Sequence, residues 1–112
     1  MSEIRELIDA LVAFRDARDW EQFHDSKNLA VAISIEAAEL NEVFLWKDSA
    51  SSEEVDKGRI KEELADVFAY SLLLAEKHGL DVKQIVLEKM AKNNEKYPVD
   101  KAKGKSDKYD QL

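Results

Sequence analysis

Four carboxylates occur in two pairs of equal spacing, and each pair lies within an apolar stretch. Glu36 and Glu39 stand in "ISIEAAELNEVFLW", residues 33–46, whereas Glu63 and Asp66 stand in "EELADVFAYSLLLAEKHG", residues 62–79. Residues three apart on an α-helix share a face, where like charges repel each other. If two such helices pack antiparallel, the four carboxylates converge. A divalent cation would then offset a repulsion that an apolar surrounding makes costly.

The ligand type narrows the choice of metal. A set of carboxylate oxygens suits Mg²⁺, Mn²⁺ or Ca²⁺. A di-iron carboxylate site in a helical bundle needs a Glu-x-x-His pair on each of two helices, and neither Glu36 nor Glu63 is followed by a His three residues on. We therefore predict Mg²⁺, with Mn²⁺ as the alternative. The competing interpretation is that both pairs lie on solvated helix faces, where this spacing is common. From the residues alone the two interpretations remain open.

The elements that position these carboxylates are predicted to be helices only. The chain has three Gly and one Pro, and no segment alternates apolar and polar residues in the manner of a strand. Capping residues and apolar spacing predict four helices: from about Ser2 to Arg18, from Asp25 or Ser26 to Trp46 or Lys47, from Ser51, with Glu54 completing a capping box, to His78 before Gly79, and from Asp81 to Lys96.

The third of these helices is apolar on nearly all sides from Leu64 to Ala75. Such a helix is buried in a bundle or in a subunit interface. A chain of 112 residues makes one domain with a modest core, so some apolar helix faces stay uncovered. We predict an all-α, four-helix-bundle-like domain over residues 1–98 that is completed by oligomerisation, as a dimer or a tetramer. Residues 99–112 form a polar, basic tail that we expect to be disordered or ordered only against a partner.

Composition excludes several classes of function. The absence of Cys rules out disulfides and thiolate metal sites. No signal-peptide pattern is visible and charges interrupt every long apolar run, so we expect a cytoplasmic protein without a membrane partner. A net charge of −7 argues against a nucleic-acid-binding surface, which needs a basic stripe. It is compatible with an anionic small molecule whose contact is mediated by metal.

Aromatic residues near the acidic pairs have two interpretations. Trp20, Phe23, Trp46 and Tyr70 are most simply core residues or amphipathic residues at helix ends. Together with His24 they could instead form a pocket that stacks a nucleotide base. From the residues alone both interpretations remain open.

Three segments, in this order, resemble one enzyme family. They are "RDWEQFHDSKNLAVAISIEAAELNEVFLW", "EELADVFAYSLLLAEKHGLD" and "KMAKNNEKYP". The chain resembles the all-α nucleotide pyrophosphohydrolases, and most of all the short MazG-like enzymes and their dCTP pyrophosphatase relatives. The resemblance covers about residues 14 to 104. It implies a Mg²⁺-dependent hydrolysis of a nucleoside triphosphate, with dCTP favoured, to the monophosphate and pyrophosphate, and a role in cleansing the nucleotide pool.

The resemblance also implies roles for individual residues. The metal ligands of the family fall on Glu36, Glu39, Glu63 and Asp66. Its base-pocket residues fall on His24 and Trp46, with Trp20, Phe23 and Tyr70 beside them, and its phosphate-contacting residues fall on Asn93, Lys96 and Tyr97, with Lys89 one turn earlier. The family often has Arg where this chain has Lys96, and a lysine offers a point charge instead of a planar fork.

The assembly implied by the resemblance is a homodimer or a homotetramer of two dimers, with more than one subunit around each site. We expect Glu36 or Glu39 to take the proton of the attacking water, with Glu62 as the alternative. Two other function classes remain: a non-catalytic helical dimerisation module, and a protein that binds nucleotide or metal without turnover.

Overall fold

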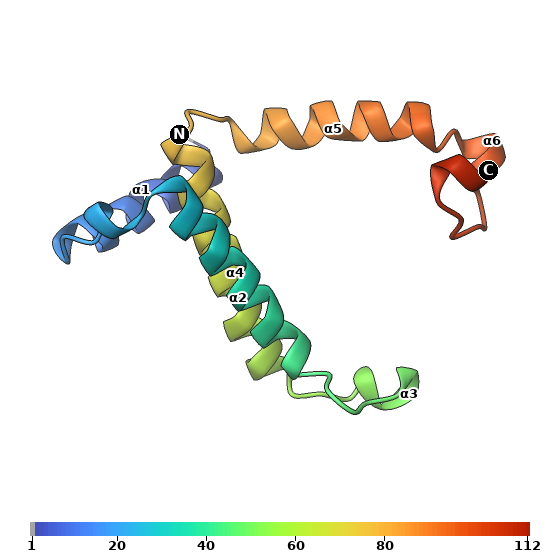
Figure 1. The fold of residues 1–112 in the computed structure, drawn as a ribbon, viewed down its shortest axis with the longest axis horizontal. Helices are drawn as coiled ribbons and strands as arrows, with labels where there is room; N and C mark the ends of the chain where they lie inside the picture. Colours follow the sequence, from blue (N-terminus) through green and yellow to red (C-terminus); the bar gives the residue numbers. More distant parts are fainter. Residues whose placement is uncertain (1) are drawn as a thin grey trace. The chain divides into compact units, whose positions relative to one another are not determined.

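The computed structural model describes residues 2–112, and within this range it contains helices and no strand. The predicted all-α class is therefore confirmed. The helices shown in Figure 1 are α1 (Glu3–Ala17), α2 (Ser26–Glu42), α3 (Ser49–Ser52), α4 (Lys57–Lys77), α5 (Val82–Lys96) and α6 (Val99–Ala102), with the 3₁₀ helices η1 (Glu21–Phe23) and η2 (Tyr109–Gln111). None of the described helices combines the length and the apolar character that crossing a membrane requires.

The chain divides into two compact units, one ending at Gly79 and the other covering Leu80–Leu112. In the first unit α2 and α4 lie side by side and run in opposite directions, and α1 packs on α4 (Figure 1). Its core is small and apolar, consisting of Ile8, Leu29, Val43, Leu72, Leu73 and Ala75. This core holds the α2–α4 pair in a fixed register, so the helix faces that meet each other are determined.

Three helices begin at the capping residues that the sequence predicts. The side chain of Ser2 accepts a hydrogen bond from the backbone N–H of Arg5. The side chain of Asp25 accepts one from the backbone N–H of Asn28 at 2.7 Å. At the start of α5 the side chain of Asp81 accepts one from the backbone N–H of Gln84. Each of these bonds satisfies a backbone donor that has no partner within its helix. The start of α2, which carries two of the acidic residues, is thereby fixed.

The end of α2 differs from the prediction. The helix ends at Glu42, whereas the apolar run suggested that it continues to Trp46 or Lys47. Beyond it the backbone N–H of Phe44 and that of Leu45 bond to carbonyls only three residues back. The chain tightens into a turn, and Trp46 follows with a left-handed φ of 64°. Hydrophobicity alone therefore did not locate this helix end.

The predicted capping box at Ser51 and Glu54 is wrong. Asp48 caps α3 instead, accepting from the backbone N–H of Ser51 at 2.8 Å, while the Ser51 hydroxyl accepts from the N–H of Asp48. Ser51 is thus the third residue of a short helix and is not available as a cap. The long helix α4 begins later, and its cap is Asp56.

The end of α4 matches the prediction. Gly79 adopts a left-handed φ of 63° directly after the capping residue His78, which is the usual way for an α-helix to stop. His78 also has a specific partner, because its Nε2 lies 2.8 Å from the hydroxyl of Ser26. This bond joins the first turn of α2 to the last turn of α4.

The second unit contains α5, α6 and η2. Residues 99–112, expected to be disordered or ordered only against a partner, carry two short helices. The ring of Tyr109 meets that of Tyr97 edge to face, with centroids 6.0 Å apart. The expectation was wrong because one aromatic side chain gives this polar stretch a contact within its own chain.

Candidate functional site

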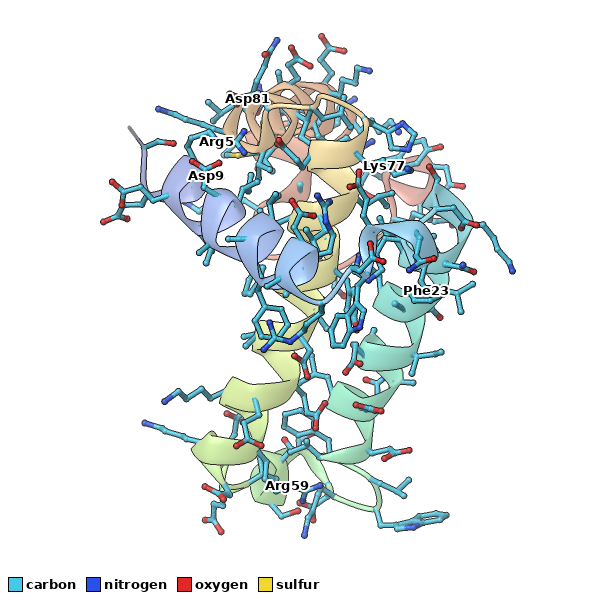
Figure 2. The ribbon with its side chains drawn as sticks, turned by 90° about the vertical axis from the view of Figure 1, so that its left-hand side faces the viewer. Arg5, Asp9, Phe23, Arg59, Lys77 and Asp81 are labelled. Carbon is cyan, nitrogen blue, oxygen red and sulfur yellow. The ribbon has the colours of Figure 1, made fainter. Side chains whose placement is uncertain are left out.

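Three of the four predicted ligands meet between α2 and α4. Glu36, Glu39 and Glu63 each offer a carboxylate oxygen, and these oxygens lie within 4.8 Å of one another. Two come from α2 and one from α4, whereas the prediction was two from each helix. Figure 2 shows the extent of this helix pair, with Phe23 beside the first turns of α2 and Arg59 at the opposite end, near the start of α4.

Charge repulsion and burial both affect this carboxylate cluster. Burial, followed by the hydrogen bond and charge of Glu39, raises the pKa of Glu36 to about 7. The same causes raise the pKa of Glu63 above its usual value. One oxygen of Glu36 and one of Glu63 are buried without a hydrogen-bond partner. Buried acceptors normally have a partner, so a crowded set of carboxylate oxygens with two orphans fits a hard divalent cation such as Mg²⁺.

Asp66 lies one turn beyond Glu63 on α4 and is exposed. It is outside the three-oxygen group, but its negative charge contributes to the raised pKa of Glu36 and of Glu63. Its side chain also lines a neighbouring pocket. The fourth predicted ligand therefore stands between the carboxylate cluster and that pocket.

The pocket has a volume of about 360 Å³ and is walled by α1, by α4 and by Trp20 and His24, the two residues that flank η1. This volume is in the range of small-molecule sites. The rings of His24 and Tyr70 meet edge to face with centroids 6.3 Å apart. The lining residues are Leu7, Ala10, Leu11, Phe14, Arg15, Trp20, His24, Asp66, Ala69, Tyr70 and Leu73. An apolar, aromatic pocket with a few polar atoms suits a nucleotide base.

Two polar groups in the pocket have shifted pKa values. Burial, and secondarily the positive charge of Arg15, lowers the pKa of His24, so its imidazole is neutral at pH 7. Its Nδ1 is buried without a hydrogen-bond partner. Burial and the charges of Glu36 and Asp66 raise the pKa of Tyr70, which keeps its hydroxyl protonated. The pocket thus presents a hydrogen-bond donor and an imidazole whose role depends on its tautomer.

Two of the predicted base-pocket residues do not line this pocket. Trp46 is 93% exposed in the turn after α2, and Phe23 is 60% exposed in η1. The interpretation of Trp46 as a core residue is therefore wrong. Trp20, by contrast, lines the pocket, and its ring meets that of Phe14 edge to face at 5.9 Å.

The predicted phosphate-contacting residues all belong to the second unit. Lys89, Asn93 and Lys96 are exposed on α5, and Tyr97 is its C-terminal capping residue. Their spacing places them along one face of the helix. Their phosphate contact stays a prediction.

Sequence reasoning missed the contribution of α1 to the pocket. Leu7, Leu11 and Phe14 are spaced four and then three residues apart, so they share a helix face. None of the three was predicted to line a site. An aromatic residue continuing an apolar face beyond the core residue Ile8 was the available signal, with Arg15 next to it.

The family match, the related sequences and the related structure all point to one group of enzymes. The sequence profile of the MazG-like family matches residues 31–112. The proteins named dCTP pyrophosphatase 1 from Rattus norvegicus and Homo sapiens are each 38% identical to this chain over 104 residues, which is 88% of this chain and 61% of theirs. The chain thus spans less than two thirds of the length of these curated relatives. The crystal structure of a pyrophosphatase from Archaeoglobus fulgidus is 45% identical, with a TM-score of 0.84 over 88% of this chain and 94% of that one.

Proposed function

The chain belongs to the MazG-like family, and from this premise we propose that it is a Mg²⁺-dependent nucleoside triphosphate pyrophosphohydrolase. Its favoured substrate is dCTP, which it converts to dCMP and pyrophosphate, and its role is to cleanse the nucleotide pool. The observation that carries the proposal is the set of three carboxylate oxygens within 4.8 Å of one another, together with an aromatic pocket whose lining includes Asp66, one turn beyond Glu63 on α4.

The metal would be held by Glu36, Glu39, Glu63 and Asp66, with Mn²⁺ as an alternative to Mg²⁺. When bound, the cation supplies neutralisation of the triphosphate charge and a lowered pKa for a coordinated water. Two orphaned oxygens in the carboxylate cluster support this assignment, because oxygens without partners are free to act as ligands.

The remaining chemistry is assigned to residues of the chain. A water attacks the α-phosphorus in line with the bond to the bridging oxygen of the β-phosphate. Glu36 or Glu39 takes the proton of that water, with the exposed Glu62 as the alternative. The bond between the α-phosphorus and the bridging oxygen breaks, and pyrophosphate leaves with the bonding electrons. The ammonium of Lys96 offsets the charge that develops on this leaving group.

Recognition of the base is assigned to both sets of aromatic residues. His24, Trp20 and Tyr70 line the pocket, while Trp46 and Phe23 offer exposed rings for stacking. The neutral imidazole of His24 can read a hydrogen-bonding edge of a base, which discriminates more sharply than stacking does. The names of the 38% identical relatives favour cytosine as that base.

We further propose that the chain acts in the cytoplasm as a homodimer or homotetramer, with residues 1–98 as the catalytic domain. Several large apolar side chains of α2 and α4 are exposed in the single chain: Val31, Ile35, Leu64 and Phe68. Covering them with a second copy would remove this apolar surface from water. Sedimentation at micromolar concentration tests the proposal, and a stable folded monomer would contradict it.

A pyrophosphate-release assay with a panel of dNTPs tests the activity. We expect one pyrophosphate and one deoxynucleoside monophosphate per substrate, fastest with dCTP, and no turnover in excess EDTA. A dimerisation module would neither bind nor cleave dNTPs, and a sequestering protein would bind them without releasing pyrophosphate. Release of orthophosphate in place of pyrophosphate would also contradict the proposal.

A further inference from the structure

The C-terminal segment turns back toward the end of α5. After α6 the chain reverses at Gly104, whose φ is 77°. Apart from the adjoining residues, no atom lies within 4 Å of the position that a Cβ would take there, so the backbone conformation, not a lack of space, favours glycine. The reversal allows η2 to present Tyr109 to the last residues of α5.

Tyr109 contacts two of the predicted phosphate-contacting residues. The ammonium nitrogen of Lys96 lies 4.8 Å from the centroid of the Tyr109 ring, within the range of a cation–π interaction. The ring of Tyr97 meets the same ring at an interplanar angle of 84°. Among the described residues Lys96 forms no ion pair. The Tyr109 ring is therefore the contact that orients the ammonium group of Lys96.

The type of partner has a chemical consequence. A carboxylate beside Lys96 would orient the ammonium but would also neutralise its charge, which a phosphate needs. The face of an aromatic ring attracts the cation through its quadrupole and carries no net charge. A lysine, with a flexible four-carbon stem, needs such orientation more than a planar guanidinium does.

We propose that Tyr109 is a positioning residue, whose ring holds the ammonium of Lys96 at the end of α5 so that it meets the triphosphate. This inference rests on the proposed function, in which Lys96 contacts the leaving pyrophosphate. It gives residues 99–112 a part in the reaction, although they carry no group that reacts.

A double-mutant cycle on the full chain tests this role. We expect Tyr109→Leu to lower kcat/KM for dCTP about fivefold, the scale of an exposed cation–π contact. Tyr109→Phe keeps the ring and should stay within about twofold of the wild type. In a Lys96→Gln background, Tyr109→Leu should cause no further loss, because the group that it positions is gone. Equal losses with and without Lys96→Gln would overturn the role.

The reversal at Gly104 offers an independent pair of variants. A β-branched residue is strained at positive φ, whereas asparagine tolerates it. Gly104→Val should therefore reproduce the loss caused by Tyr109→Leu, and Gly104→Asn should remain close to the wild type. Equal activity of Gly104→Val and wild type would contradict the proposal.

A spectroscopic readout follows the contact itself. In protein whose lysines carry ¹³C-methyl groups, the Lys96 signal, assigned with Lys96→Gln, should be shifted upfield by the Tyr109 ring. The shift should survive Tyr109→Phe and disappear in Tyr109→Leu. Absence of pyrophosphate release by the wild type would overturn the proposed function and the positioning role with it. An active wild type with no ring-dependent shift would overturn the positioning role alone.

Discussion

The carboxylate cluster and the proposed phosphate-contacting residues are positioned in different ways. Glu36, Glu39 and Glu63 project from two helices that share a packed core, so their convergence follows from the register of α2 against α4. Lys89 and Lys96 are exposed along a single helix, and the contact that orients the second of them comes from a short returning segment. The carboxylate cluster is thus preorganised by packing, whereas the lysines of α5 depend on weak local contacts.

The sharpest way to break this comparison is to remove one charge from the carboxylate cluster. Glu39→Gln should cut turnover by at least about a hundredfold, because losing ~2.7 kcal/mol at the transition state has that effect. Helical circular dichroism should not change, and stability in EDTA should stay equal or rise as repulsion falls. The matched control is Glu42→Gln, which alters an exposed residue of the same helix. Near-wild-type activity of Glu39→Gln would exclude the metal site.

A mixing experiment sharpens the comparison by asking which chain supplies Lys96. We expect Lys96→Gln alone to lose about tenfold in activity, as one charge-assisted contact would. If each site takes carboxylates from one subunit and Lys96 from its partner, equal mixing with Glu39→Gln makes half of the dimers mixed, each with one intact site. Activity should then rise to about a quarter of the wild type. Activity equal to the mean of the two parents would assign the carboxylates and Lys96 to one chain.

Within the first unit, we expect Trp46 to contribute base stacking and His24 to contribute base discrimination, so variants of the two residues should have different effects. Trp46→Ala should weaken all dNTPs together, by about fivefold, the lower end of base-stacking energies because the ring is exposed. His24→Ala should instead change the ranking of the dNTPs. Thermal melts give the control, since an exposed tryptophan should contribute little to stability. A uniform loss with His24→Ala, or unchanged affinities with Trp46→Ala, would count against these roles.

The last prediction concerns the pH dependence of stability in the metal-free protein. The pKa of Glu36 is raised to about 7, so this group stabilises the folded state fully below its unfolded pKa. The contribution is lost as pH rises through the folded value. In EDTA the melting temperature should therefore fall between pH 5 and pH 8, and Glu36→Gln should flatten that slope. Added Mg²⁺ should stabilise the protein more at pH 8 than at pH 5. A slope identical in both proteins would refute the assignment.

Sequence reasoning was most successful where one short-range interaction decides the structure. Ser2, Asp25 and Asp81 begin helices because each side chain accepts from the backbone N–H three residues on. Glu36, Glu39 and Glu63 converge because helix periodicity fixes their faces and α2 packs on α4, whereas Asp66 lies outside this group. Where two caps compete, as Asp48 and Ser51 do, local patterns gave the wrong start for α4.

The rest depended on interactions between distant segments. The contribution of Phe14 to the pocket requires α1 to pack on α4, and no motif in α1 specifies that contact. The return of Tyr109 to Lys96 spans residues that look uniformly polar. On α5, exposed apolar side chains such as Val86 and Met90 indicate a surface that another segment or chain would cover. Their types and spacing do not identify that segment or chain.

The conformation of Trp46 has an evolutionary consequence. An L-residue in the left-handed region costs roughly 1–2 kcal/mol, and this one holds a large ring almost entirely in water. A glycine or asparagine at that turn would relieve the strain. Selection for thermal resistance alone should therefore replace Trp46 early. Selection for nucleotide turnover should retain it. The residue found at this position should therefore differ between lineages selected for stability and lineages selected for activity.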